Sequence, residues 1–150
     1  MRTTLFALAI STFAFTACAQ SENSSSETTS ESNEMTTTQE QEAEATVQSV
    51  GPADFASMME SNPGVLVDVR TPEEYGAGHL EGSQLINYYE SDFEAKVSEL
   101  DRDVPVYVYC RSGGRSGRSA SQLHDMGFKT VIDLSGGIMA WESAGKETVK

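Results

Sequence analysis

The sequence predicts an α/β domain with a mainly parallel β-sheet that is flanked by helices on both faces. Segments of strand type and segments of helical periodicity alternate from residue 47 to residue 143, and this alternation is typical of βαβ units. Residues 65–69 form a nearly continuous apolar run, which favours a central strand buried on both faces of such a sheet. About a hundred residues are left for this domain after the polar N-terminal region, enough for one modest core.

The first elements of the domain follow from turn and cap signals. Residues 47–50 predict a short strand, and Pro52 suits the first turn of the next helix because its fixed φ matches the helical backbone. Residues 62–64 read Asn-Pro-Gly, which predicts the turn that leads into the strand at residues 65–69.

A second helix start is predicted at Thr71-Pro72-Glu73-Glu74. Thr71 can cap the helix, Pro72 fits its first position, and Glu74 can complete a capping box. Because both glutamates also favour the positive end of the helix, their predicted role is structural and not catalytic. In the glycine-rich connection that follows, His79 is expected to make a local hydrogen bond.

The remaining elements follow from the same periodicity and turn signals. They are a strand at residues 84–87, a helix over 91–100, a strand at 106–109, a helix over 115–126 that ends at Gly127, a strand at 131–134, a turn at Gly136-Gly137 and a helix over 138–143. Trp141 is expected in the core, and His124 on a solvated helix face.

The strand at residues 106–109 leads directly into Cys110. Two glycines and the predicted start of a helix come shortly after it. Ligand sites of parallel sheets lie at the carboxyl ends of the strands. Backbone N–H groups converge in such a loop, and the helix N-terminus adds a partial positive charge. Both effects favour a thiolate, so Cys110 is predicted to be a nucleophile in an anion-binding loop. The alternative for an isolated cysteine is a buried, inert side chain.

The distribution of charge narrows the class of ligand. Residues 49–150 carry sixteen acidic and nine basic side chains, within a chain of net charge −13. An acidic domain of this kind disfavours nucleic acid and anionic membranes as binding partners. Three of the nine bases, Arg111, Arg115 and Arg118, nevertheless follow Cys110 closely. This local positive charge favours a small anionic substrate.

Residues 1–18 predict an export signal of the bacterial lipoprotein type. One basic residue precedes an apolar run at residues 5–15 that is too short to span a bilayer. Phe15-Thr16-Ala17-Cys18 resembles a lipobox, in which Cys18 carries the lipid, whereas Ala17-Cys18-Ala19 also fits cleavage after Ala19. The expected location is periplasmic or elsewhere in the cell envelope, with the chain anchored to a membrane through Cys18.

Residues 19–48 predict a disordered acidic tether, and residues 49–150 the folded domain. The tether is rich in Ser, Thr and Glu and carries seven acidic side chains without a base. It has too few apolar side chains to offset the entropy of ordering. A spacer that holds the domain away from a membrane is the simplest interpretation, and a segment that binds a partner is the alternative.

Four groups of residues follow one another in a fixed order across residues 50–145. They are Asp68-Val69-Arg70; Glu74-Tyr75 with Gly78-His79-Leu80 and Gly82; Cys110-Arg111-Ser112-Gly113-Gly114-Arg115-Ser116; and Gly136-Gly137 with Ala140-Trp141. With these groups the domain resembles the single-domain rhodaneses, a family of sulfurtransferases. The resemblance implies a five-stranded, mainly parallel sheet flanked by helices.

The resemblance also implies that Cys110 alternates between a thiolate and a persulfide. A small anionic donor such as thiosulfate would supply the sulfur, and cyanide or a thiol would accept it. The substrate-binding residues would be Arg111, Ser112, Gly113, Gly114, Arg115 and Ser116. Asp68 and Arg70 are expected to brace this loop, and Gly113 and Gly114 to permit the positive φ angles that it requires.

No cofactor is expected, and no protein partner is indicated. No group of His, Cys and Asp residues has the spacing of metal ligands, so no metal site is expected either.

Two alternative functions remain. Cysteine phosphatases use a Cys-x5-Arg loop, whereas Arg115 gives Cys-x4-Arg here, and Ser116 stands where a phosphatase has arginine. The smaller loop favours a single sulfur atom over a phosphate. The other alternative is a non-catalytic module that carries a persulfide and passes it to a partner.

Overall fold

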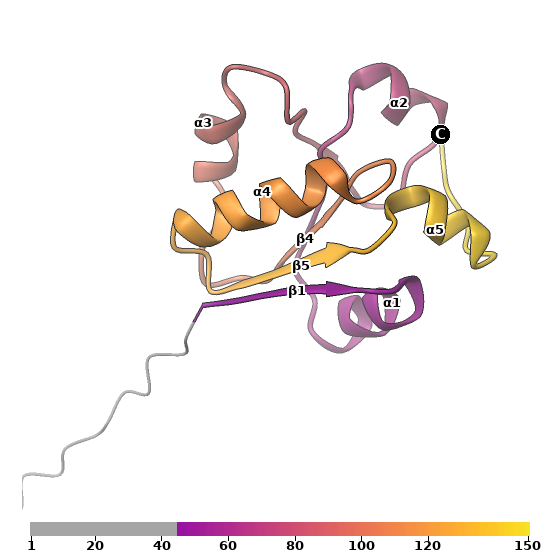
Figure 1. Cartoon of the computed structure of the whole chain (residues 1–150), viewed down its shortest axis with the longest axis horizontal. Helices are drawn as coiled ribbons and strands as arrows, with labels where there is room; N and C mark the ends of the chain where they lie inside the picture. The colour runs from indigo at the N-terminus through magenta and orange to yellow at the C-terminus, as the bar shows by residue number, and fades with distance from the viewer. Residues whose placement is uncertain (1–44) are drawn as a thin grey trace, which may run out of the picture. The chain divides into compact units, whose positions relative to one another are not determined.

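The computed structural model describes residues 45–150 (Figure 1). The predicted export signal and almost all of the predicted tether lie outside these residues. The first strand begins at Thr46, ahead of the expected domain boundary at residue 49. Within the described residues, no helix has the length and apolar character needed to cross a membrane.

Five strands and five helices alternate along the described chain. The strands are β1 (Thr46–Val50), β2 (Val65–Asp68), β3 (Gln84–Leu85), β4 (Val106–Tyr109) and β5 (Thr130–Leu134). The helices are α1 (Pro52–Ser61), α2 (Pro72–Ala77), α3 (Phe93–Ser98), α4 (Gly114–Asp125) and α5 (Gly137–Ser143).

The strands form one sheet in the order β1-β5-β4-β2-β3, and every pair in it is parallel. The predicted five-stranded α/β fold is therefore confirmed. Because β4 lies between β2 and β5, both neighbours pair with it and its four residues are all buried. The carboxyl end of β4, where Cys110 follows, thus lies in the middle of the sheet.

Helices cover both faces of the sheet, and each face has its own apolar cluster. Phe93 and Val97 of α3 and Leu123 of α4 pack on the face that also carries Cys110. Phe55 of α1 and Trp141 of α5 pack on the opposite face, with their rings edge to face. Figure 1 shows α3 and α4 on one side of the strands and α1 on the other. The predicted core position of Trp141 is confirmed.

Two elements are shorter than predicted by two residues or more. The strand expected at residues 84–87 is regular only at Gln84–Leu85, although the N–H groups of Ile86 and Tyr88 still donate to the carbonyl groups of Asp68 and Val69. A turn follows, in which the Asn87 side chain accepts a hydrogen bond from the Tyr89 N–H. The helix expected over 91–100 is regular at Phe93–Ser98 only.

The predicted caps are confirmed. The Thr71 side chain accepts from the Glu74 N–H, and the Glu74 carboxylate accepts from the Thr71 N–H, which completes the capping box of α2. After α4, Gly127 has a φ of 89° and donates to the carbonyl of His124. Only glycine takes this left-handed conformation without strain, so α4 ends there.

Candidate active site

Cys110 lies at the carboxyl end of β4, and the loop after it turns tightly into α4. The residue is 1% exposed and its thiol is free. Gly113 has a φ of 94°, which turns the chain back toward the sulfur. The positive φ predicted for Gly114 is not found. Gly114 is already the first residue of α4 and has an ordinary helical conformation.

Hydrogen-bond donors surround the sulfur of Cys110. The Gly113 N–H donates to Sγ at 3.1 Å, and the Ser116 hydroxyl donates to it at 3.5 Å. Burial by itself raises the pKa of the Cys110 thiol, but hydrogen bonds from the Ser116 hydroxyl and from the N–H groups of Ser116, Ser112 and Arg115 lower the pKa below its ordinary value. The loop therefore stabilises negative charge on this sulfur, as predicted.

Ser116→Ala is expected to raise the pKa of the Cys110 thiol, because it removes the hydroxyl donor and keeps the backbone donors. The rate of alkylation by iodoacetamide rises with pH as the thiolate forms. In the variant, the midpoint of this rise in rate should move to higher pH by on the order of half to one unit. In Ser112→Ala the midpoint should stay unchanged, because Ser112 contacts the sulfur only through its backbone N–H. An unchanged midpoint in Ser116→Ala would show that the hydroxyl does not hold the thiolate.

The start of α5 closes the loop from the other side. The Ile138 N–H donates to the carbonyl of Cys110 at 2.8 Å, and the Met139 N–H donates to the carbonyl of Arg111 at 3.2 Å. Gly137 lies so close to this loop that a Cβ atom on it would overlap the Cys110 carbonyl oxygen. Close approach of α5 to the cysteine loop thus explains Gly137, whereas Gly136 has a φ of 74° and a Cβ atom on it would overlap the Ala140 side chain.

Arg115 is held by Glu74. Its guanidinium donates two hydrogen bonds of 2.7 Å to the two carboxylate oxygens of Glu74, and it lies 5.6 Å from the centre of the Tyr89 ring. The hydrogen bond from Arg115 lowers the pKa of Glu74 to about 2. Arg115 was predicted to bind an anionic substrate directly. In the structure it links α4 to α2, and Glu74 serves both this pair and the capping box.

Asp68 and Arg70 form a buried ion pair at the end of β2. The Arg70 guanidinium donates to both carboxylate oxygens of Asp68, with a shortest distance of 2.6 Å, and also donates to the Gly78 carbonyl at 2.7 Å. It lies 5.5 Å from the centre of the Tyr109 ring. Tyr109 immediately precedes Cys110, so the pair lies where it can support the start of the loop.

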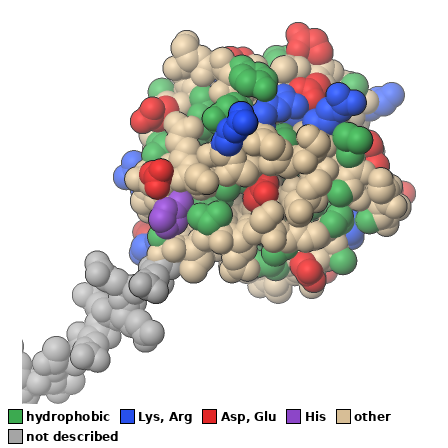
Figure 2. Space-filling view, viewed as in Figure 1, with side chains coloured by type: hydrophobic (Ala, Val, Ile, Leu, Met, Phe, Trp, Pro, Cys, Tyr) green, Lys and Arg blue, Asp and Glu red, His purple; other side chains and the backbone are tan. Residues whose placement is uncertain are grey.

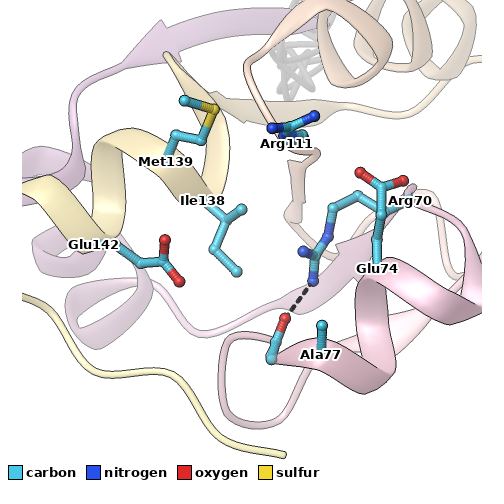
Figure 3. Close-up of a pocket in the computed structure, with 8 residues that line it drawn as sticks. Arg70, Glu74, Ala77, Arg111, Ile138, Met139 and Glu142 are labelled. Carbon is cyan, nitrogen blue, oxygen red and sulfur yellow. Dashed lines mark hydrogen bonds between the residues drawn. The ribbon is translucent and has the colours of Figure 1, made fainter.

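A pocket of about 290 Å³ opens beside the cysteine loop. Figure 3 shows Ile138, Met139 and Glu142 of α5 along one wall, Arg70, Glu74 and Ala77 along the other, and Arg111 between them. Cys110 does not line the pocket, but its neighbour Arg111 does, and Ile138 is hydrogen-bonded to the Cys110 carbonyl.

The pocket lies in a region where charges of both signs occur. Lys and Arg side chains gather at the top of Figure 2, on the side where α2 lies in Figure 1, with acidic and apolar side chains among them. Arg111, Ser112 and Arg118 are exposed.

The two histidines lie outside the site and match their predicted roles. His79 makes a 3.2 Å hydrogen bond to the Tyr75 carbonyl and stacks on the Tyr75 ring, and His124 is exposed on α4. Among residues 45–150, no group of three or more His, Cys, Asp or Glu residues could hold a metal ion.

Comparison with known proteins places the whole of this site within one family. A family model of the rhodanese-like domain matches residues 51–144, a range that runs from α1 to α5. The thiosulfate sulfurtransferase GlpE of Pseudoalteromonas translucida is 32% identical over 98 residues, which cover 65% of this chain and 91% of that protein. GlpE of Pseudomonas fluorescens is 37% identical over 93 residues, which cover 61% of this chain and 83% of that protein.

A solved structure shows the same architecture. The rhodanese-related protein from Thermoplasma volcanium is 29% identical, with a TM-score of 0.61, and the similarity covers 68% of this chain and 97% of that one.

Proposed function

The chain belongs to the rhodanese-like domain family, and we propose that it transfers a sulfane sulfur from an anionic donor such as thiosulfate, through a persulfide on Cys110, to cyanide or a thiol. Similarity to the GlpE enzymes supports sulfurtransferase activity in general. The observation that carries the finer proposal is the set of hydrogen bonds that converge on the Cys110 sulfur and lower its pKa.

In the first half-reaction the Cys110 thiolate attacks the outer sulfur of thiosulfate. A new S–S bond forms to Sγ, the S–S bond within thiosulfate breaks, and its electron pair leaves with sulfite. The negative charge of the enzyme then lies on the outer sulfur of the persulfide. N–H groups of the loop stabilise the charge before and after this step, so the protein does not need to reorganise. Arg111 is exposed beside the loop, where it can attract the donor and assist the departure of sulfite.

In the second half-reaction the acceptor attacks the outer sulfur of the persulfide. The Cys110 S–S bond breaks, its electron pair returns to Sγ, and the acceptor leaves with the sulfur atom. Cyanide gives thiocyanate, and a thiolate gives a persulfide of the acceptor. Division of the transfer into two steps through a covalent intermediate is nucleophilic catalysis with ping-pong kinetics.

The structure disfavours phosphate as a substrate of the same loop. The first arginine after Arg111 gives Cys-x4-Arg, and that residue, Arg115, is held by both carboxylate oxygens of Glu74. A phosphatase needs an arginine free to form a fork around the phosphate oxygens. This arrangement supports transfer of a single sulfur atom.

Steady-state kinetics with thiosulfate and cyanide test the proposal. Double-reciprocal plots at several cyanide concentrations should give parallel lines, with thiocyanate released at each turnover. A persulfide that forms on Cys110 but passes to no small acceptor would instead identify a sulfur carrier. Hydrolysis of an aryl phosphate without any thiosulfate activity would contradict both.

We further propose that this domain acts outside the cytoplasm, in the periplasm or cell envelope, attached to a membrane by a lipid on Cys18. The proposal rests on the apolar run at residues 5–15 and on Phe15-Thr16-Ala17-Cys18. The polar residues 19–48 would then separate the domain from the membrane. The intact mass of the membrane-extracted protein tests this: a diacylated chain that begins at Cys18 is expected, and an unmodified chain that begins at Gln20 would contradict it.

A further inference from the structure

The pocket beside the cysteine loop contains two charged side chains that have no ion-pair partner among the described residues. Of its four charged lining residues, Arg70 pairs with Asp68, and Glu74 pairs with Arg115. The other two are Arg111 and Glu142, both exposed. Within residues 45–150 neither of these side chains forms an ion pair. The pocket therefore offers a ligand one free cation and one free anion.

Apolar atoms lie between these two charges. Ile138 and Met139 lie on the same wall as Glu142, and Figure 3 shows Ile138 between Glu142 and the side of the pocket where Arg70 lies. Met139 is half-exposed, so the pocket is accessible from solvent. A volume of about 290 Å³ is just below the range of about 300–1,000 Å³ for small-molecule sites. These features fit a compact molecule with a short aliphatic part and charged groups of both signs.

We propose that the sulfur acceptor is a zwitterionic amino-acid thiol. Its α-carboxylate pairs with Arg111, its α-ammonium pairs with Glu142, and its methylene group contacts Ile138 and Met139. Arg111 adjoins Cys110, and the Ile138 N–H donates to the Cys110 carbonyl, so a thiol bound in this way contacts the loop that carries the persulfide. This inference rests on the proposed sulfurtransferase function.

Glu142 is the residue that makes the pocket selective for an amino-acid thiol over purely anionic small molecules. Cyanide and thiosulfate are anions without a positive group, and a carboxylate on the pocket wall does not attract them. An ammonium group two bonds from the carboxylate carbon, as in an α-amino acid, uses both free charges at once. Charges arranged in this complementary way discriminate among ligands more than they raise overall affinity.

The transfer itself needs no further reagent. The acceptor thiolate attacks the outer sulfur of the Cys110 persulfide, a new S–S bond forms on the acceptor, and the Cys110 S–S bond breaks. Its electron pair returns to Sγ, which regenerates the thiolate that the loop stabilises. The products are the amino-acid persulfide and free enzyme.

The test compares three acceptors on the full chain after it has been loaded with thiosulfate. L-cysteine carries both charges, 3-mercaptopropionate lacks the ammonium group, and cysteamine lacks the carboxylate. For each acceptor, kcat/KM of a variant is divided by that of the unsubstituted protein, so that differences in intrinsic thiol reactivity cancel.

Glu142→Gln is expected to lower kcat/KM for L-cysteine and for cysteamine roughly 3- to 10-fold, the range of a partly exposed ion pair. For 3-mercaptopropionate, kcat/KM of this variant should stay the same or rise. Glu142→Lys should reverse the preference, so that 3-mercaptopropionate is favoured over cysteamine. Glu94→Gln makes the same change of charge at an exposed position of α3 and serves as the matched control, with no change in any ratio.

The outcomes separate the two proposals. If the persulfide forms but the three acceptors respond equally to both Glu142 variants, the acceptor inference is overturned and the sulfurtransferase function stands. If no persulfide forms on Cys110, both are overturned. A selective loss for the two ammonium-bearing thiols, with loading by thiosulfate unaffected, supports the inference.

Discussion

Cys110→Ser is expected to reduce turnover of thiosulfate and cyanide by on the order of 10⁴-fold or more, because removal of a covalent nucleophile removes the whole reaction path. Serine has the same shape and fits the buried site at the end of β4. Its hydroxyl has a far higher pKa than the thiol and cannot hold a transferable sulfur. The measurement is the initial rate of thiocyanate formation by purified protein, with the fold checked by circular dichroism.

The chain itself supplies a matched control for this substitution. Cys18 is the only other cysteine in the sequence. Cys18→Ser removes the other cysteine and leaves the sequence of the loop unchanged, and equal amounts of purified protein should turn over thiosulfate at the original rate. Full activity in Cys110→Ser, or loss of activity in Cys18→Ser alone, would refute the assignment of the nucleophile.

The second large effect concerns stability. Asp68→Ala leaves the Arg70 guanidinium buried without a counter-charge, since both side chains are almost fully buried. Loss of one partner from a buried ion pair costs about 3–5 kcal/mol, a large part of the total of about 5–15 kcal/mol that stabilises a domain. The free energy of unfolding in urea should fall by this amount, and the melting temperature should fall by more than about 10 °C.

A double variant separates the charge from the packing. In Asp68→Leu with Arg70→Met neither charge of this buried pair is left, and most of the lost stability should return. A loss of less than about 1 kcal/mol in Asp68→Ala would show instead that Arg70 reaches solvent and that the pair does not brace the loop that follows Tyr109.

The sequence predicted the order and type of every element because the signals for them are local. Turn residues, the capping box at Thr71 and Glu74, and the apolar run at residues 65–69 each act within a few positions. The position of Cys110 after a buried strand was predictable for the same reason. The direction of the pKa shift of the Cys110 thiol was predictable because the loop and the helix start follow Cys110 directly in the chain.

Features that depend on distant residues were not predictable. Glu74 and Arg115 are 41 residues apart, and nothing in the chain between them signals that they pair. The role proposed for Glu142 likewise depends on the approach of α5 to α2, which only the folded chain defines. The glycines at 113 and 114 look equivalent in sequence, yet the start of α4 between them gives only Gly113 a positive φ.

Asp133 is a further feature that the sequence did not reveal. Its side chain is buried in β5, where one carboxylate oxygen accepts a 2.9 Å hydrogen bond from Ser49 of β1. The other carboxylate oxygen has no partner among the described residues. In sequence this residue lies within an apolar strand pattern, and only the register of β1 with β5 brings Ser49 beside it.

The mass of the peptide that contains Cys110 tests the central claim most directly. The full chain is incubated with thiosulfate, freed of excess donor and digested without reductant. We expect a gain of one sulfur atom, about 32 Da, on Cys110, and its loss when cyanide or L-cysteine is added. A peptide that keeps its unmodified mass while the protein still produces thiocyanate, or a sulfur atom found on another residue, would contradict the persulfide mechanism.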